Sequence, residues 1–248
     1  MTWASRRKSL YLGVSLTIIL FIALGVTYAF FSRLPSCTDG LRNGDEQGID
    51  CGGVCEKLCR GEARAPTVLW SRAFEVAPGL YSAAAYLENP NAGAYARNAR
   101  YVFKLFDDNN VLIAERESAI DLPTQRIISI VETNIGTGSR IPVRTFFEFI
   151  RDISWEKAPT APQVRVTGTI FDERSRRLEA SVVNEDMIDV TDINASAVLF
   201  DAEGTARAAS KSKIARLRKG RTEQIVFTWP TVFPDIVRSE IILLIPKQ

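Results

Sequence analysis

Residues 86–132 read YLENPNAGAYARNARYVFKLFDDNNVLIAERESAIDLPTQRIISIVE, and residues 181–227 read SVVNEDMIDVTDINASAVLFDAEGTARAASKSKIARLRKGRTEQIVF. The two stretches align at an offset of about 95 residues. The matched positions are Asn89 with Asn184, Leu105-Phe106-Asp107 with Leu199-Phe200-Asp201, Leu122 with Leu217, and Val131 with Val226. A repeat of this length indicates a whole domain present in two copies, not a solenoid unit.

The local pattern within each copy is that of β-strands. Residues 101–106 alternate with a period of two, as expected for a mostly buried strand. Turn-forming residues follow at 107–110 and at 201–204, and further strands are expected at 195–200, 222–227 and 241–245. Short strands separated by turns predict a mainly β fold with two tandem antiparallel immunoglobulin-like β-sandwiches, at 66–158 and 162–248.

The stretch between the copies, Ala158-Pro159-Thr160-Ala161-Pro162, predicts a short, stiff hinge. We therefore expect the two sandwiches to stack end to end. Trp70 and Trp229 are expected to lie in a core or between sheets.

The stretch Phe103-Lys104-Leu105-Phe106-Asp107 resembles the signature strand of the FxLYD family of small extracytoplasmic sandwiches. Asn89-Pro90 and Asn184-Glu185 resemble the start of that family's pattern. The chain departs from the pattern at Phe106, where the family has tyrosine, and at Ala197, where it has the first phenylalanine. The resemblance implies a sandwich fold and a surface location, and it brings no catalytic residues.

The N-terminal region contains an uncharged apolar run, LYLGVSLTIILFIALGVTYAFF, at residues 10–31. A helix of this length can cross a hydrocarbon core of about 30 Å. Arg6, Arg7 and Lys8 precede the run, and Arg33 follows it. The positive-inside rule therefore predicts a cytoplasmic tail at 1–9, a single transmembrane helix at 10–32 in the lipid bilayer, and all later residues outside.

Two alternatives to this anchor remain open. Cleavage near Thr27-Tyr28-Ala29 would make the run a signal peptide, although signal peptides have a shorter apolar core. Leu34-Pro35-Ser36-Cys37 resembles a lipobox, although Arg33 separates it from the apolar run.

All four cysteines, Cys37, Cys51, Cys55 and Cys59, lie in a short segment at 37–59 that has few apolar residues. An even number of clustered cysteines on the oxidising side of a membrane predicts a knob held by two disulfides, with three possible pairings. The pattern Cys37-x-Asp39-Gly40 with Asp50-Cys51-Gly52-Gly53-x-Cys55 resembles the D-C-G-G cysteine motif of secreted and surface-anchored proteins. The resemblance implies an extracellular setting and no activity.

The polar residues of the knob allow two interpretations. Oxygen donors on a glycine-rich loop suit calcium, which takes six to eight oxygens. They equally suit turns in which side chains accept hydrogen bonds from backbone amides, and this second interpretation is favoured because the spacing is not that of an EF-hand. A zinc site is disfavoured because CxxxCxxxC is not the paired CxxC spacing. The candidate calcium ligands are Asp39, Asn43, Asp45, Glu46 and Asp50.

A basic cluster in the second copy is a candidate contact for an anionic surface such as a wall polymer, lipid headgroups or an acidic partner. The alternative is that these residues form a solvated hairpin that protects an edge strand. An acidic loop at 185–192 could bind a cation weakly, meet a neighbour's basic cluster, or be simply solvated. The basic residues are Lys211, Lys213, Arg216, Arg218, Lys219 and Arg221.

Composition narrows the function classes further. The net charge of +2 does not indicate a nucleic-acid partner, and the absence of histidine removes the commonest general base and metal ligand. We therefore expect a membrane-anchored extracytoplasmic binding or scaffolding protein, without catalysis or a required cofactor, whose partner is a protein or an envelope polymer. The alternatives are a structural subunit of a cell-envelope membrane complex and, least favoured, an enzyme.

Overall fold

The computed structural model describes residues 3–31, 36–158, 160–233 and 235–247. The chain is mainly β, with one apolar N-terminal helix, a disulfide-bonded segment and several antiparallel sheets, as the sequence predicts. Two compact units are described separately, Met1–Cys55 and Glu56–Gln248. Arg33, Leu34 and Pro35, used in the orientation and lipobox arguments, and Pro159 of the hinge lie outside the described residues.

The first unit contains helix α1 (Trp3–Phe31). Within it, Leu10–Tyr28 is long and apolar enough to cross a membrane, and the side chains described there are exposed. After the helix, residues 36–55 form a series of tight turns. Gly53 has a φ of +56°, and a Cβ at this position would lie 1.7 Å from the backbone oxygen of Asp45. Only glycine fits there.

The second unit consists of two sandwiches with the same topology. In the first, the sheet order β1-β2-β5 faces the order β4-β3-β6, with β7 paired to β3. The second repeats this arrangement as β8-β9-β12 and β11-β10-β13. The first set of strands is β1 (Thr67–Ala77), β2 (Leu80–Glu88), β3 (Ala94–Phe106), β4 (Leu112–Leu122), β5 (Ile127–Gly136), β6 (Arg144–Phe149) and β7 (Trp155–Lys157). The second set is β8 (Val164–Asp172), β9 (Arg177–Asn184), β10 (Val190–Phe200), β11 (Ala206–Leu217), β12 (Thr222–Thr228) and β13 (Arg238–Leu244).

The expected strands at 195–200, 222–227 and 241–245 fall within or largely within β10, β12 and β13. Each sandwich has its own apolar core because alternate residues of each strand point inward. Phe103 and Leu105 of β3 are fully buried in the first core, and Leu199 of β10 and Phe227 of β12 in the second. Trp229 packs in the second core.

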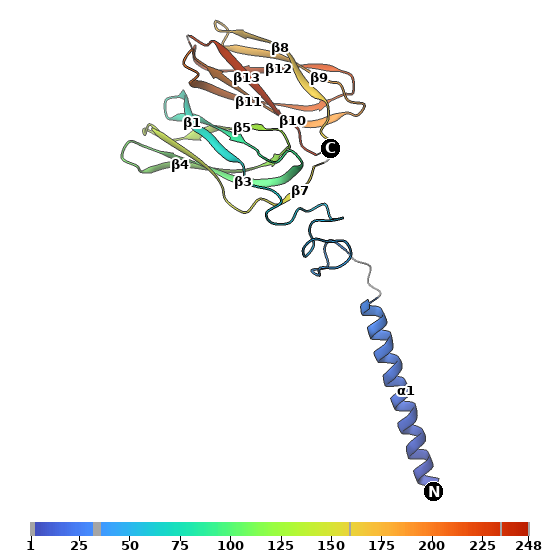
Figure 1. Ribbon diagram of the computed structural model, residues 1–248. Helices are drawn as coiled ribbons and strands as arrows, with labels where there is room; N and C mark the ends of the chain where they lie inside the picture. Colours follow the sequence, from blue (N-terminus) through green and yellow to red (C-terminus); the bar gives the residue numbers. More distant parts are fainter. Residues whose placement is uncertain (1–2, 32–35, 159, 234, 248) are drawn as a thin grey trace. The chain divides into compact units, whose positions relative to one another are not determined.

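The expectation of an end-to-end arrangement is wrong, because the two sandwiches pack face to face (Figure 1). The sheet β1-β2-β5 of the first sandwich packs on the sheet β11-β10-β13 of the second through a third apolar cluster. The reason lies in β2, where both alternating sets of buried side chains are apolar apart from Ser82, and only the terminal residues, Leu80 and Glu88, are less than fully buried. A strand with two apolar faces needs a covering layer on each side.

Aromatic rings form the centre of this third cluster. Trp70 and Tyr86 stack with ring centroids 4.7 Å apart, and Phe200 of the second sandwich meets Tyr86 edge-on at 6.3 Å. The Tyr86 hydroxyl donates a hydrogen bond of 2.7 Å to Glu240, and Arg72 donates to the Ala206 carbonyl at 2.9 Å. The interface therefore combines buried rings with satisfied polar groups, which fixes the relative placement of the two sheets.

Candidate functional site

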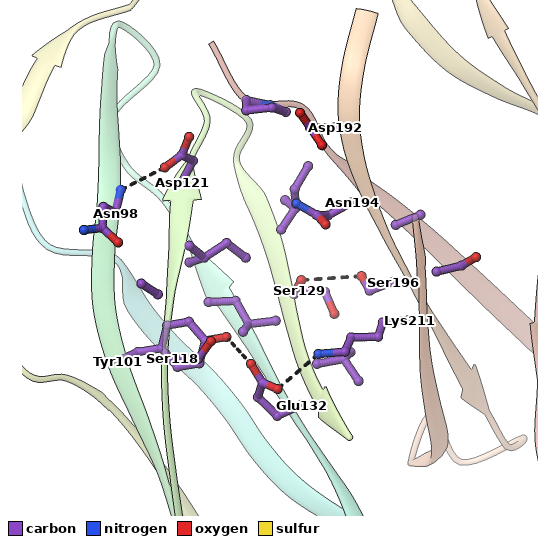
Figure 2. A pocket seen from close by; sticks show the side chains of 18 of the residues that line it. Asn98, Tyr101, Ser118, Asp121, Ser129, Glu132, Asp192, Asn194, Ser196 and Lys211 are labelled. Atoms are coloured by element: carbon purple, nitrogen blue, oxygen red, sulfur yellow. Dashed lines mark hydrogen bonds and ion pairs between the residues drawn. The ribbon is translucent and has the colours of Figure 1, made fainter. Parts of the chain in front are cut away.

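A polar cavity of about 510 Å³ lies at one side of the inter-sandwich interface in the second unit. Its walls come from β3, β4 and β5 of the first sandwich, from β10 and β11 of the second, and from the C-terminal residues Leu244, Pro246 and Lys247. Figure 2 shows side chains from these walls pointing toward one another. The polar lining residues labelled there are Asn98, Tyr101, Ser118, Asp121, Ser129, Glu132, Asp192, Asn194, Ser196 and Lys211.

Glu132 of β5 is the central charged group of the cavity, with 4% of the residue exposed. The Tyr101 hydroxyl donates a hydrogen bond to its Oε1 at 2.7 Å, and Lys211 Nζ donates to its Oε2 at 3.0 Å. Arg116 Nε lies 3.9 Å from the same oxygen. Because Tyr101 belongs to the first sandwich core and Lys211 to the second sandwich, Glu132 connects the two domains electrostatically.

The ionisation of this group follows from its neighbours. Burial alone would raise the pKa of Glu132, but the hydrogen bonds from Tyr101 and Lys211 and the charge of Lys211 outweigh burial and hold that pKa below its usual range. Burial, together with the bond to Glu132, raises the pKa of the Tyr101 hydroxyl. The pair is therefore a carboxylate and a protonated phenol at neutral pH.

The opposite end of the cavity is organised by Asp121 of β4. Its Oδ2 accepts a 2.5 Å hydrogen bond from the Tyr95 hydroxyl, and its Oδ1 accepts one from the Asn98 backbone N–H at 2.8 Å. The Lys247 backbone N–H donates to the Tyr95 oxygen at 2.9 Å. Burial and the bond to Asp121 raise the pKa of Tyr95. The C-terminal segment is thus hydrogen-bonded to the first sandwich.

Two lining residues at equivalent positions of the two copies, Asn98 and Asp192, have left-handed backbone conformations, with φ of 51° and 56°. Asn98 lies at a register shift between Ala96 and Ala99, where β3 bulges away from regular pairing with β4. Bulges re-aim side chains and are frequent beside binding sites, and a left-handed residue other than glycine is uncommon. Both copies therefore present an irregular strand segment to the same cavity.

Sequence reasoning did not identify this cavity. The sequence does contain one indication of the cavity, namely Glu132, the acid that directly follows the mostly apolar run Ile127–Val131. An acid in such a strand predicts a buried carboxylate with specific partners. Asn98 and Asn194 carried no signal, because an amide in a strand usually faces solvent.

The cysteine segment has the predicted disulfides, with Cys37 bonded to Cys55 and with Cys51 and Cys59 also disulfide-bonded. No described cysteine is free. Zinc is therefore not supported at Cys51, Cys55 and Cys59, since a metal ligand must be a thiolate. A metal site formed by Glu46 with Cys37 and Cys55 is not supported either, because both of these sulfurs belong to one disulfide.

The proposed calcium ligands mostly serve the backbone. Asp50 accepts from the Gly40 N–H at 3.0 and 3.1 Å, and Asp39 accepts from the Leu41 N–H at 2.8 Å and from the Asn43 amide at 2.8 Å. Glu46 accepts the N–H groups of Asn43 and Asp50 at 3.4 and 3.3 Å. Asp45 contributes its backbone oxygen to the close approach at Gly53. These contacts fit the turn interpretation, and calcium binding stays a prediction.

The basic cluster does not form one uniform surface. Lys211 reaches into the cavity, Lys213 pairs with Asp192 at 2.7 Å, and Arg216 pairs with Asp189 at 2.6 Å. The Lys219 N–H and the Arg216 guanidinium hold the pKa of Asp189 below its usual range. The acidic loop is thus the partner of the basic residues within one chain.

The remaining basic residues, Arg218, Lys219 and Arg221, lie in the exposed β11–β12 turn. Arg218 and Arg221 line a shallow hollow together with Arg216 and Glu223. Because Lys211, Lys213 and Arg216 already have acidic partners, the part of the cluster left to meet an anionic surface is this turn. Contact with an anionic surface stays a prediction.

Comparison with known proteins adds no relative. No family model matches the chain, so the FxLYD and D-C-G-G resemblances stay predictions, and no curated protein matches it. Among solved structures, a β-glucuronidase of Bacteroides uniformis matches 62% of this chain with 14% identity and a TM-score of 0.18. Bacteroides uniformis β-glucuronidase 2 matches 69% with 12% identity and a TM-score of 0.16. The chain spans 22% of each, and likeness at this level carries no functional argument.

The carboxylate of Glu132 makes a testable contribution to stability. At pH 7, Glu132→Gln is expected to lower the free energy of unfolding by about 1–3 kcal/mol, because charge-assisted hydrogen bonds to a buried group are lost. The folded pKa is depressed, so the contribution is complete above the unfolded pKa and is lost as the pH falls through the folded value. Urea denaturation at pH 7 and below about pH 4 measures both effects, since an unperturbed glutamate titrates near 4.3.

The matched control is Glu117→Gln, which removes the exposed pair with Arg100. This variant is expected to change stability by less than about 1 kcal/mol at both pH values. An equal loss for the two variants at pH 7 would contradict the role assigned to Glu132.

Proposed function

We propose that this protein is a membrane-anchored, non-catalytic binding or scaffolding protein whose two-sandwich unit lies outside the cytoplasm. The observation that carries the binding role is the polar cavity at the junction of the two sandwiches, whose walls come from both copies. A site built on rigid strands of two packed domains keeps its geometry without a ligand. The FxLYD resemblance, with its implied surface location, points the same way.

The membrane anchor and the orientation in this proposal rest on the N-terminal segment of the chain, residues 1–59. An apolar span at Leu10–Tyr28 follows Arg7 and Lys8 and precedes the disulfide-bonded segment. Disulfides form and persist in oxidising compartments. A helix with basic residues on its N-terminal side and disulfides on its C-terminal side is consistent with only one orientation in a cytoplasmic membrane.

Protease accessibility on intact cells tests this proposal. We expect an external protease to remove a C-terminal epitope tag and to leave an N-terminal tag intact, and we expect alkylation of the four cysteines only after reduction. In a control variant, Arg6, Arg7 and Lys8 are replaced by serine. It is expected to lose uniform orientation, because the charge asymmetry that sets the topology is gone. A protected C-terminal tag with four free thiols would refute the proposal.

A second candidate function, a structural subunit of an envelope complex, is favoured by an apolar surface at one end of the first sandwich. Phe106 and Phe146 meet edge-on at 5.5 Å, and Phe146 remains 54% exposed. Leu112, Ile141 and Val143 are also exposed, at 44%, 69% and 63%. Leu112 pairs with Phe106, and the Val143 N–H bonds to the Phe106 carbonyl, so these side chains gather around one point.

Repeat equivalence strengthens this candidate. Phe106 pairs across strands with Arg144, as Phe200 pairs with Arg238 in the second copy. In the second copy that pair belongs to the sheet that docks on the first sandwich, where Phe200 meets Tyr86. The first copy thus carries the equivalent pair, Phe106 and Arg144, on its outer sheet. Among the described residues, no neighbouring sandwich packs on that sheet.

The test of the second candidate is the size of the complex extracted from the membranes of the native cell. Phe146→Lys is expected to reduce that complex to the free chain without altering the thermal midpoint of the purified protein. Ile170→Lys, at a residue 70% exposed on β8 of the second sandwich, provides the control and is expected to leave the complex intact. A complex that survives Phe146→Lys excludes this surface as a subunit contact.

A further inference from the structure

Among the residues that the structure describes, the charged groups of the inter-sandwich cavity are already matched by other groups of the chain. Glu132 is bonded to Tyr101 and Lys211, Asp121 accepts two hydrogen bonds, and Asp192 is paired with Lys213. The side chain of Lys247 lies 3.3 Å from Glu56 and 3.8 Å from Glu156. A ligand with a net charge would therefore have to break an existing pair, and its binding would lose the corresponding free energy.

The hydrogen-bonding groups that remain available are neutral. Asn98 and Asn194 extend from opposite walls, one from each sandwich, and neither amide side chain has a hydrogen-bond partner within the described part of the chain. Each amide supplies two donors and an acceptor with two lone pairs. Both residues are exposed on the cavity side, so a bound molecule can reach them without rearrangement of the sheets.

The next polar groups of the cavity are the hydroxyls of Ser129 and Ser196, which differ in their hydrogen bonding. Ser129 is 1% exposed, and its buried hydroxyl has no partner among the described residues. Ser196 donates only long bonds, of 3.4 Å to the Ser129 carbonyl and 3.5 Å to the Ile242 carbonyl. Bonds of this length are weak, so the Ser196 hydroxyl gains from a partner with better geometry.

We propose that this cavity binds a neutral, polyhydroxylated molecule of the size of one or two sugar units, held between the Asn98 and Asn194 amides. A hydroxyl both donates and accepts, which matches walls of amides and hydroxyls better than a purely donating or purely accepting ligand does. The volume of about 510 Å³ falls within the usual range of small-molecule sites, about 300–1,000 Å³. This inference rests on the binding role proposed above and specifies its ligand.

The left-handed residues explain why the cavity persists between two sheets that pack closely elsewhere. The bulge at Asn98 breaks the regular pairing of β3 with β4, and Asp192 at the equivalent position of β10 has a left-handed backbone conformation. At the other part of the same interface, the rings of Trp70, Tyr86 and Phe200 pack against one another. The interface is therefore apolar and aromatic in one part and open and polar in the other.

The experiment is a titration of the full chain in phosphatidylcholine nanodiscs, because sugar-based detergents would compete for the site. The probes are glucose, N-acetylglucosamine, galactose, mannose, and the β-1,4-linked dimer and tetramer of N-acetylglucosamine, followed by saturation-transfer NMR. Saturable binding of at least one neutral sugar is expected. If the tetramer binds at least as tightly as the dimer, the natural ligand is a sugar unit within a polymer. If only monosaccharides bind, the natural ligand is a free sugar.

Two variants connect the binding to the cavity. Asn194→Leu keeps the side-chain size, removes the amide, and is expected to weaken binding by about tenfold, as for one or two hydrogen bonds in a shielded site. Gln224→Leu makes a similar replacement at an exposed position of β12 outside the cavity and is expected to have no effect.

Absence of saturable binding to every probe would overturn the inference, as would equal affinity of the Asn194→Leu and parent proteins. Preferential binding of glucuronate or glucosamine 6-phosphate, added as charged competitors, would also overturn it, because the ligand would then carry charge. None of these results would affect the protease accessibility of the C-terminal tag. Failure of this inference is therefore distinguishable from failure of the proposed function.

Discussion

The second apolar face of the sheet β1-β2-β5 is the constraint on which the arrangement of the second unit depends. Phe74, Ala84, Tyr86 and Val131 point away from the first core, and they are buried because the sheet β11-β10-β13 covers them. Complete burial of one large apolar side chain contributes about 1.5–3 kcal/mol, so a cluster of this size can decide the arrangement of the domains. The tandem repeat is therefore a single packed body with four sheets.

The same comparison of copies shows that the outer face of the second sandwich differs from the corresponding face of the first. The position of Tyr86 is occupied by Ser181 in the second copy, and the position of Ala84 by Glu179, which pairs with Arg177. The outer face of β8-β9-β12 is thus polar where the corresponding face of the first copy is aromatic and small. A polar face of this kind can remain solvated, so it needs no covering layer. The opposite end is less well closed, because Phe106 and Phe146 remain on the outer face of the first sandwich.

The sequence was sufficient for the helix, the disulfides and the two sandwiches, because each depends on a local pattern. The run at 10–31, the four cysteines at 37–59 and the alternation at 101–106 each specify one element. The arrangement of the domains was predicted wrongly because the two prolines at the hinge suggested a spacer. The informative segment was Tyr81–Leu87, whose near-continuous apolar residues are typical of a strand covered on both faces.

The candidate site could be predicted only in part. The acids of the knob were recognised as turn formers, since short polar side chains bond to nearby amides. The basic cluster was identified by its charge, but the pairing of Lys213 with Asp192 and of Lys211 with Glu132 depends on residues far apart in sequence. The cavity depends on left-handed conformations at Asn98 and Asp192 and on the meeting of two domains, neither of which a single sequence reveals.

Hydrogen exchange with mass spectrometry at increasing urea concentrations tests the central claim, that the two sandwiches form one cooperative body. Peptides from β2 and β5 of the first sandwich are expected to lose protection in the same transition as peptides from β10 and β11 of the second. Loss of protection in the second sandwich at a urea concentration that leaves β2 fully protected would contradict it, because the inter-sandwich interface would then contribute little to stability.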